Sequence, residues 1–213
     1  MAISYTPTEE KANSTSHAIG ILLGIAASSY FFRITNHGYD IWAQAGIALY
    51  AFGILSSYIS STIYHACLPT SRWRERLRKL DHSAIYWHIA GSYSPIIFIG
   101  LREDVVWGMT LFFIVWGCAL IGSILSLVRL KEHSYIETGC FVAMGLIVLI
   151  AFKPVLEAIG WESMRWIIAE GVAFITGAVF YSIHKKKFMH TVFHLFVLLG
   201  SVFHILAIWE MLT

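Results

Sequence analysis

Two histidines four residues apart, His190 and His194, stand at the start of the last apolar stretch of the chain. On a helix, this spacing places both imidazoles on one face, one turn and about 6 Å apart along the axis. An ionisable side chain that enters a membrane helix is costly, so its presence indicates a functional site. Two imidazoles at this spacing also form the local geometry with which a helix binds zinc. Such a site needs a third ligand at the same depth.

The composition places the chain among membrane proteins. Hydrophobic residues make up 57% of its 213 residues and charged residues only 13%. Seven apolar stretches are each near the length of about 20 residues that crosses a bilayer as a helix. We place them at His17–Ile34, Ile41–Tyr64, Ser83–Gly100, Val105–Val128, Ile136–Phe152, Met164–Ile183 and His190–Leu212. The sequence therefore predicts an all-α membrane protein, a single seven-transmembrane helix bundle over residues 1–213.

Short sequence motifs predict how the first stretch begins and how the third stretch packs. Thr6, Pro7 and Glu9 predict a helix that begins with a capping box ahead of the first apolar stretch. No basic segment or cleavage site precedes that stretch, so we expect a retained span rather than a signal peptide. Gly91 and Pro95 predict a kink or close helix packing in the third stretch.

Lysine and arginine are distributed unequally between the connections. Eleven of them lie on the side of the N-terminus, namely Lys11, Arg72, Arg74, Arg76, Arg78, Lys79, Arg129, Lys131, Lys185, Lys186 and Lys187. The four on the opposite side are Arg33, Arg102, Lys153 and Arg165. The positive-inside rule predicts a cytoplasmic N-terminus and an external C-terminus. A net charge of +2 gives no reason to expect a nucleic acid partner.

Polar residues from four stretches meet in the cytoplasmic layer that this topology defines. His65 ends the second stretch there, Asp81 opens the third, and His190 and His194 enter the seventh. Three imidazoles with one open position form the pattern of a catalytic zinc site, so we predict His65, His190 and His194 as ligands. In the first stretch, a helical stripe at i, i+3 and i+7 reaches the same layer, and it consists of Glu10, Asn13 and His17.

Two residues near the predicted ligands, Asp81 and Ser61, each have two interpretations. Asp81 either caps the third helix or orients and deprotonates a water at the metal. Ser61, one turn before His65, either bonds back to a carbonyl of its own helix or acts on the substrate. Cys67 is a weak additional candidate for the metal shell, whereas Cys118 and Cys140 are expected to serve in packing.

These motifs resemble those of the hemolysin III group. The matching residues are Glu10-x-x-Asn13-x-x-x-His17, Ser61-x-x-x-His65, Asp81 and His190-x-x-x-His194. That group belongs with the progestin and adipoQ receptors in a superfamily that also contains alkaline ceramidases, and the resemblance covers essentially the whole chain. It implies seven helices and a zinc ion just inside the cytoplasmic leaflet. Carried over by motif, His65, His190 and His194 hold the zinc and Asp81 is linked to it through water.

Three functions follow from the site and the resemblance. The first is a zinc-dependent intramembrane hydrolase of a lipid amide or ester, similar to ceramidases, with Asp81 and Ser61 as catalytic residues. The second is a non-enzymatic regulator or sensor of membrane lipid, in which zinc ties helices together. The third is a cytolysin or channel, which would need a polar line through the bilayer. In the first two cases the partner is a membrane lipid, and the expected location is the bacterial cytoplasmic membrane.

Overall fold

The computed structural model describes residues 5–129, 135–183 and 186–213. These residues form seven α-helices and no strand. The helices are α1 (Pro7–Gly38), α2 (Ile41–Ala66), α3 (Arg74–Pro95), α4 (Val105–Arg129), α5 (Tyr135–Gly145), α6 (Phe152–Ser182) and α7 (Met189–Leu212). A π-helical turn, η1 (Ile96–Gly100), continues α3, and a 3₁₀ turn, η2 (Leu146–Leu149), continues α5. Lys131 and Lys185, counted above as basic loop residues, lie outside the described residues.

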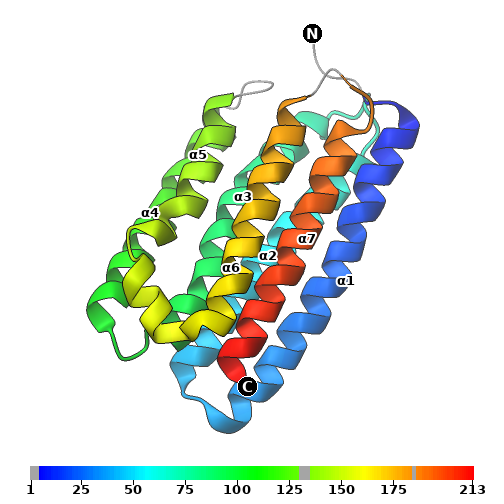
Figure 1. The fold of residues 1–213 in the computed structure, drawn as a ribbon. Helices are drawn as coiled ribbons and strands as arrows, with labels where there is room; N and C mark the ends of the chain where they lie inside the picture. Colours follow the sequence, from blue (N-terminus) through cyan, green and yellow to red (C-terminus); the bar gives the residue numbers. More distant parts are fainter. Residues whose placement is uncertain (1–4, 130–134, 184–185) are drawn as a thin grey trace.

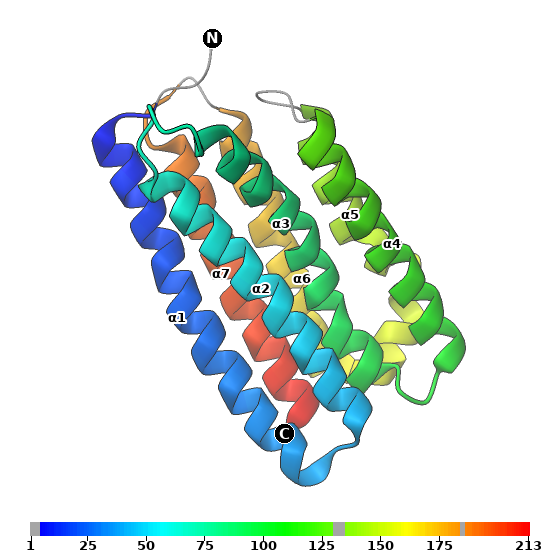
Figure 2. The ribbon, with the colours of Figure 1, turned by 180° about the vertical axis from the view of Figure 1, so that it is seen from behind.

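The helices stand side by side in one bundle (Figures 1 and 2). α1 packs against α2 and α7, α2 also packs against α3, and α6 packs against α7, so the first and last helices are neighbours. α3 in turn packs against α4. α5 makes fewer contacts with its neighbours than these helices do. The bundle therefore brings α1, α2, α3 and α7 together, which are the four helices that carry the predicted site.

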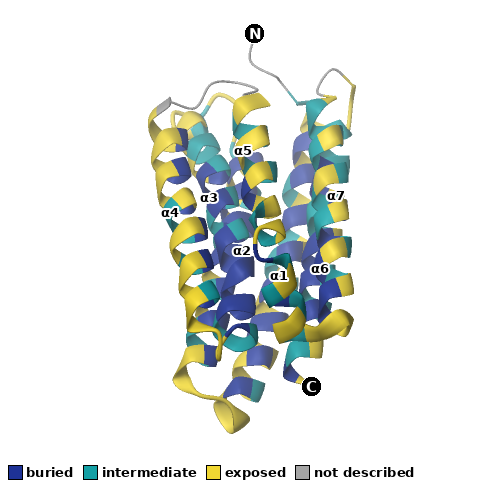
Figure 3. Ribbon diagram, turned by 60° about the vertical axis from the view of Figure 1, so that its left-hand side comes forward, coloured by how far each residue is buried: buried dark blue, intermediate teal, exposed yellow. Residues whose placement is uncertain are grey.

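The outer surface of the bundle is apolar. Leu22, Val106 and Phe113 are all more than 60% exposed. Figure 3 shows exposed residues along the outward side of α4, while buried residues gather in the interior. Such a surface is unfavourable in water and suits a lipid environment. Among the described helices, α1, α2, α4, α6 and α7 are long and apolar enough to cross a membrane.

The start of α1 agrees with its sequence signal. The Thr6 side chain accepts a hydrogen bond from the Glu9 backbone, and the Glu9 carboxylate accepts one from Thr6 N at 2.9 Å, which completes the predicted capping box. α3 instead begins at Arg74, nine residues before the predicted stretch at Ser83. Hydropathy marks only the apolar part of a helix, and the polar first turns of α3 precede it.

α6 is also longer than its apolar stretch. It begins at Phe152, and a kink at Gly160 separates its first turns from the predicted stretch at Met164. Gly160 has φ +71°, a conformation that a residue with a Cβ adopts at a cost. The predicted fifth stretch, Ile136–Phe152, corresponds to the short helix α5 and to η2, and its last residue begins α6.

Small residues bring α2 and α3 into close contact. A Cβ on Gly53 would lie 2.4 Å from the backbone oxygen of Trp87, and one on Gly91 would lie 3.0 Å from the Cα of Gly53. Backbones approach this closely only where side chains are absent. The prediction of close helix packing is therefore confirmed. Directly after Pro95, α3 changes to a π-helical turn.

Candidate metal centre

Three histidine side chains from α2 and α7 converge at one end of the bundle. The Nε2 atom of His190 lies 3.2 Å from that of His65 and 3.0 Å from that of His194. One ring nitrogen from each histidine lies within 4.8 Å of the other two, and no further residue among those described joins this group. His65 and His194 are fully buried within the bundle. The structure thus brings together the three residues predicted as ligands.

The geometry of these imidazoles fits a zinc ion. Zn–N bonds of about 2.0–2.1 Å in a tetrahedral site separate the ligand nitrogens by about 3.3 Å. The observed Nε2 separations of 3.0 and 3.2 Å are close to that value. Three neighbouring nitrogens that all point inward need a shared cation or shared protons between them. Three imidazoles with one free position are the ligand set of a catalytic zinc site.

A carboxylate on α1 orients the first of these histidines. Glu10 Oε2 lies 2.6 Å from His65 Nδ1 and accepts a hydrogen bond from its N–H, which leaves Nε2 free to bind a metal. The other oxygen of Glu10 accepts a hydrogen bond from Arg74. Arg74 also donates to the backbone oxygens of Tyr64 and Cys67 at 2.7 and 2.6 Å. The end of α2, the start of α3 and α1 are therefore joined around His65.

The same helix orients His194. Its Nδ1 atom lies 3.2 Å from the backbone oxygen of Asn13 and 3.3 Å from the hydroxyl of Ser16. The Asn13 side-chain oxygen accepts a hydrogen bond from Thr191 of α7 at 2.5 Å. With Nδ1 engaged by α1, Nε2 of His194 is again the nitrogen directed toward the cluster. α1 contributes no ligand itself, but it fixes the ring orientation of two of the three.

His17, the last member of the stripe on α1, stacks on His194. The two ring centroids are 3.6 Å apart and the planes differ by 9°. His17 is buried, its edge packs against Tyr58, and neither of its ring nitrogens has a hydrogen-bond partner among the described residues. It lies outside the group of three converging nitrogens. It therefore supports the position of a ligand ring and lines the cavity described below.

Asp81 and Ser61 lie beside the cluster. Asp81 is in the eighth position of α3, so the interpretation as a helix cap is wrong. Its buried carboxyl is close enough to His65 for an electrostatic interaction, yet it does not belong to the converging group. The Ser61 hydroxyl makes no hydrogen bond within the described residues, although it is near enough to Asp81 to interact with it. The expected bond from Ser61 back to its own helix is therefore not found.

A cavity of about 360 Å³ begins at this cluster and extends into the bundle. Asp81, His190 and Ser61 line one end, and Glu170 and His204 line it deeper in the bundle. Between them its walls are mostly apolar side chains of α3, α5, α6 and α7. The lining also includes residues of α6 that are exposed on the outside of the bundle, among them Val172 and Ile175. These residues place part of the cavity wall at the outer surface of the bundle.

Comparison with known proteins identifies the family. Residues 5–205 match the profile described as "Haemolysin-III related". The chain belongs to the haemolysin III family. It is 32% identical to the hemolysin-3 homolog of Bacillus subtilis over 92% of this chain and 91% of that protein. It is 33% identical to hemolysin-3 of Bacillus cereus over 91% of this chain and 87% of that protein.

A more distant relative extends the relationship beyond bacteria. The human monocyte to macrophage differentiation factor is 27% identical over 98% of this chain and 87% of its own length. The resemblance stated from the sequence motifs is therefore confirmed. As a haemolysin III protein with long apolar helices, the chain is a membrane protein.

Sequence reasoning missed several residues of the site in this haemolysin III protein. Arg74 had been grouped with the basic residues of its loop, and nothing in its spacing distinguishes it from Arg76. Tyr5 precedes α1, and its ring stacks on His190 with centroids 5.0 Å apart. Burial raises the pKa of the Tyr5 hydroxyl above its ordinary value, so this group stays a hydrogen-bond donor at neutral pH.

The cysteines do not take the roles considered for them. Cys67 is directed to the backbone oxygen of Leu68 at 3.8 Å and is not part of the converging group. Cys118 and Cys140 are exposed on the bundle surface, so the expectation that they serve in packing is wrong. On a surface that faces lipid, a thiol is a small apolar side chain and needs no partner.

Proposed function

We propose that this haemolysin III protein is a zinc-dependent hydrolase that cleaves an amide or ester of a membrane lipid. One observation carries the proposal: the cluster of three converging imidazoles adjoins a mostly apolar cavity, which His190, His194 and Asp81 line. A site that only stabilised the fold would not need such a cavity. Zinc at this position would polarise a lipid carbonyl and lower the pKa of a water at its open position.

The protein's own residues divide the remaining chemistry. Asp81 lies beside the cluster without joining it, a suitable position to orient the attacking water and to take its proton. Ser61 has a buried hydroxyl beside Asp81, so it can donate to the oxygen that gains charge in the transition state. Glu10 and Asn13 hold the ligand rings in place, which limits reorganisation during the reaction.

The apolar walls favour a lipid chain as the part of the substrate that lies inside the protein. A volume of about 360 Å³ is within the usual range of ligand pockets. Val172 and Ile175 mark a side from which a lipid can enter from the membrane without crossing water. The scissile bond then lies at the histidine cluster, and the head group lies at the same end of the bundle.

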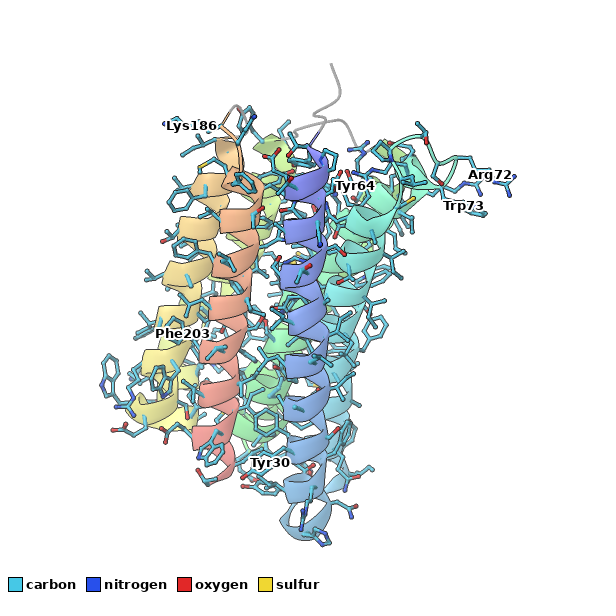
Figure 4. The ribbon with its side chains drawn as sticks, turned by 90° about the vertical axis from the view of Figure 1, so that its right-hand side faces the viewer. Tyr30, Tyr64, Arg72, Trp73, Lys186 and Phe203 are labelled. Atoms are coloured by element: carbon cyan, nitrogen blue, oxygen red, sulfur yellow. The ribbon has the colours of Figure 1, made fainter. Side chains whose placement is uncertain are left out.

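We further propose that all seven helices cross the bacterial cytoplasmic membrane with the N-terminus inside. The distribution of eleven against four basic residues supports this orientation. Figure 4 shows Arg72 and Lys186 at one end of the bundle and Tyr30 toward the other. With the basic end in the cytoplasm, the histidine cluster lies in the inner leaflet.

A second function is favoured by one specific observation. The cluster joins α2 to α7, and Glu10 and Asn13 tie both to α1. Zinc could therefore act only as a structural link in a protein that senses or regulates membrane lipid. The relatives named hemolysin-3 raise a cytolytic role, but a cavity with mostly apolar walls does not favour an aqueous pore.

The Asp81→Asn variant separates catalysis from a structural role. It keeps the size of the side chain and weakens its basicity, so a hydrolase should retain zinc and melting temperature. Its cleavage of a ceramide or a diacylglycerol should fall by about 100-fold or more. Zinc content, melting temperature and hydrolysis are measured on wild type, Asp81→Asn and His65→Ala.

Asp104→Asn, at an exposed carboxylate beyond the other end of α3, is the matched control and should leave all three quantities unchanged. Unchanged hydrolysis in zinc-loaded Asp81→Asn would exclude the catalytic role of Asp81. If zinc is only structural, His65→Ala should lower the melting temperature sharply, and Asp81→Asn should change no activity.

A further inference from the structure

The deep part of the cavity holds a polar pair in apolar surroundings. His204 of α7 and Glu170 of α6 are 2% and 7% exposed, and His204 Nδ1 lies 2.8 Å from Glu170 Oε2. His204 follows His194 by ten residues on the same helix, which places it about 15 Å deeper. This pair is too distant to contact the histidine cluster. The chemistry proposed for that cluster gives it no role.

The pair leaves one nitrogen unsatisfied. Since Nδ1 of His204 donates to Glu170, its Nε2 atom is available as a hydrogen-bond acceptor. This atom is buried and has no partner among the described residues. Buried polar groups without a partner are rare because they lose their hydration without compensation. An additional group that can donate a hydrogen bond is therefore expected at this place.

The shape and lining of the cavity indicate what kind of molecule carries the group that donates to His204 Nε2. Both residues of the pair line the same cavity as the histidine cluster. The walls between the cluster and the pair include apolar side chains such as Phe174 and Val197. A molecule that reaches from the cluster to the pair must therefore be apolar between these two places and carry a polar group at each of them.

We propose that Glu170 and His204 form a subsite for a hydroxyl group on the acyl chain of the lipid substrate. This subsite rests on the proposed function, because that function places the carbonyl of the lipid's acyl chain at the histidine cluster. A separation of about 15 Å corresponds to on the order of twelve carbons of an extended chain. The hydroxyl donates to Nε2 of His204, while Glu170 fixes the orientation of the ring. The protein thereby selects chains hydroxylated near their middle over unsubstituted chains.

Tyr50 lies near the pair, and a water bound between the two residues is another way to give His204 Nε2 a hydrogen bond. The ring of Tyr50 lies 5.3 Å from that of His204, and its buried hydroxyl also lacks a partner. A water between Tyr50 and His204 would satisfy both groups without any ligand. Such a water predicts no preference among lipid chains, so binding measurements distinguish it from the proposed subsite.

The test compares three fatty acids that differ only in one hydroxyl. Equilibrium binding to the purified full chain in lipid nanodiscs is measured with octadecanoic, 2-hydroxyoctadecanoic and 12-hydroxyoctadecanoic acids. One added buried hydrogen bond should make the 12-hydroxy acid bind about 3- to 10-fold more tightly than the other two. Equal affinity for all three acids on the wild-type protein would overturn the subsite.

Two variants test whether His204 causes the preference for the 12-hydroxy acid. His204→Phe should bind octadecanoic acid as the wild type does and lose the preference for the 12-hydroxy acid. His88→Phe is the matched control, because His88 also lines the cavity but its Nε2 atom already faces the Ser201 hydroxyl at 3.5 Å. This control should keep the preference. A preference that survives His204→Phe, or that disappears equally in both variants, would also overturn the subsite.

The binding test and the cleavage test can each give a negative result without the other. The affinities are measured without any reaction, and they can be repeated on Asp81→Asn. A protein that prefers the 12-hydroxy acid but cleaves no lipid retains the subsite and loses the proposed hydrolase. A protein that cleaves lipids without this preference retains the hydrolase and loses the subsite.

Discussion

The most direct test of the site acts on a residue that is expected never to touch the metal. In Glu10→Gln the neutral amide replaces the carboxylate that accepts the His65 Nδ1 proton at 2.6 Å. The amide oxygen cannot serve both His65 and Arg74 as two carboxylate oxygens do. His65 then loses its fixed orientation and part of its basicity. Loss of a carboxylate that holds a ligand histidine typically weakens metal binding 10- to 100-fold, which is about 1.4–2.8 kcal/mol.

The assay is a zinc titration of the purified protein against a chelator of known affinity. Glu9→Gln is the matched control, because Glu9 bonds to Thr6 and to the Phe188 backbone and not to a histidine. It should keep the zinc affinity of the wild type while it weakens the start of α1. Wild-type affinity in Glu10→Gln would refute the orienting role of Glu10. Equal weakening in both variants would show that any disturbance of α1 acts on the site.

Three further predictions concern the metal, the topology and the backbone. The purified protein should contain about one zinc per chain by elemental analysis, and His190→Ala or His194→Ala should remove most of it; stoichiometric zinc in the double variant would contradict the assignment. A reporter fused after Thr213 should report the outside and one fused after Arg76 the cytoplasm, and the reverse result would move the site to the other leaflet. Gly160→Ala should destabilise the protein by about 1–3 kcal/mol, measured as a lower melting temperature, because φ 71° with ψ 171° is a backbone conformation essentially restricted to glycine; an unchanged melting temperature would show that α6 can straighten there.

Spacing was sufficient to predict which histidines meet. His190 and His194 share a helix face by their separation alone, and charge asymmetry placed His65 at the same end. The stripe of Glu10 and Asn13 likewise follows from helical periodicity, and both residues reach ligand rings. Their role at a metal stays a prediction until zinc is measured. These features could be predicted because each depends on helical spacing or on the side of the membrane at which a helix end lies.

Features that depend on packing between distant elements were not accessible. The role of Arg74 requires the end of α2, the start of α3 and α1 to be placed together, and its sequence context is that of any basic loop. The kink at Gly160 arises from a backbone angle that an isolated glycine does not signal. The cavity is space left among α1, α2, α3, α5, α6 and α7. The contact of His204 with Glu170 likewise depends on how α7 packs against α6.

The placement of α1 has a consequence for the order in which the protein matures. His65 belongs to the second helix made, its supporting carboxylate to the first, and the remaining two histidines to the last. A segment that lacks α7 therefore contains only one of the three histidines. The three imidazoles can come together only after α7 has been made and has packed beside α1 and α2. Metal binding at this site would therefore report that the first and last helices have assembled.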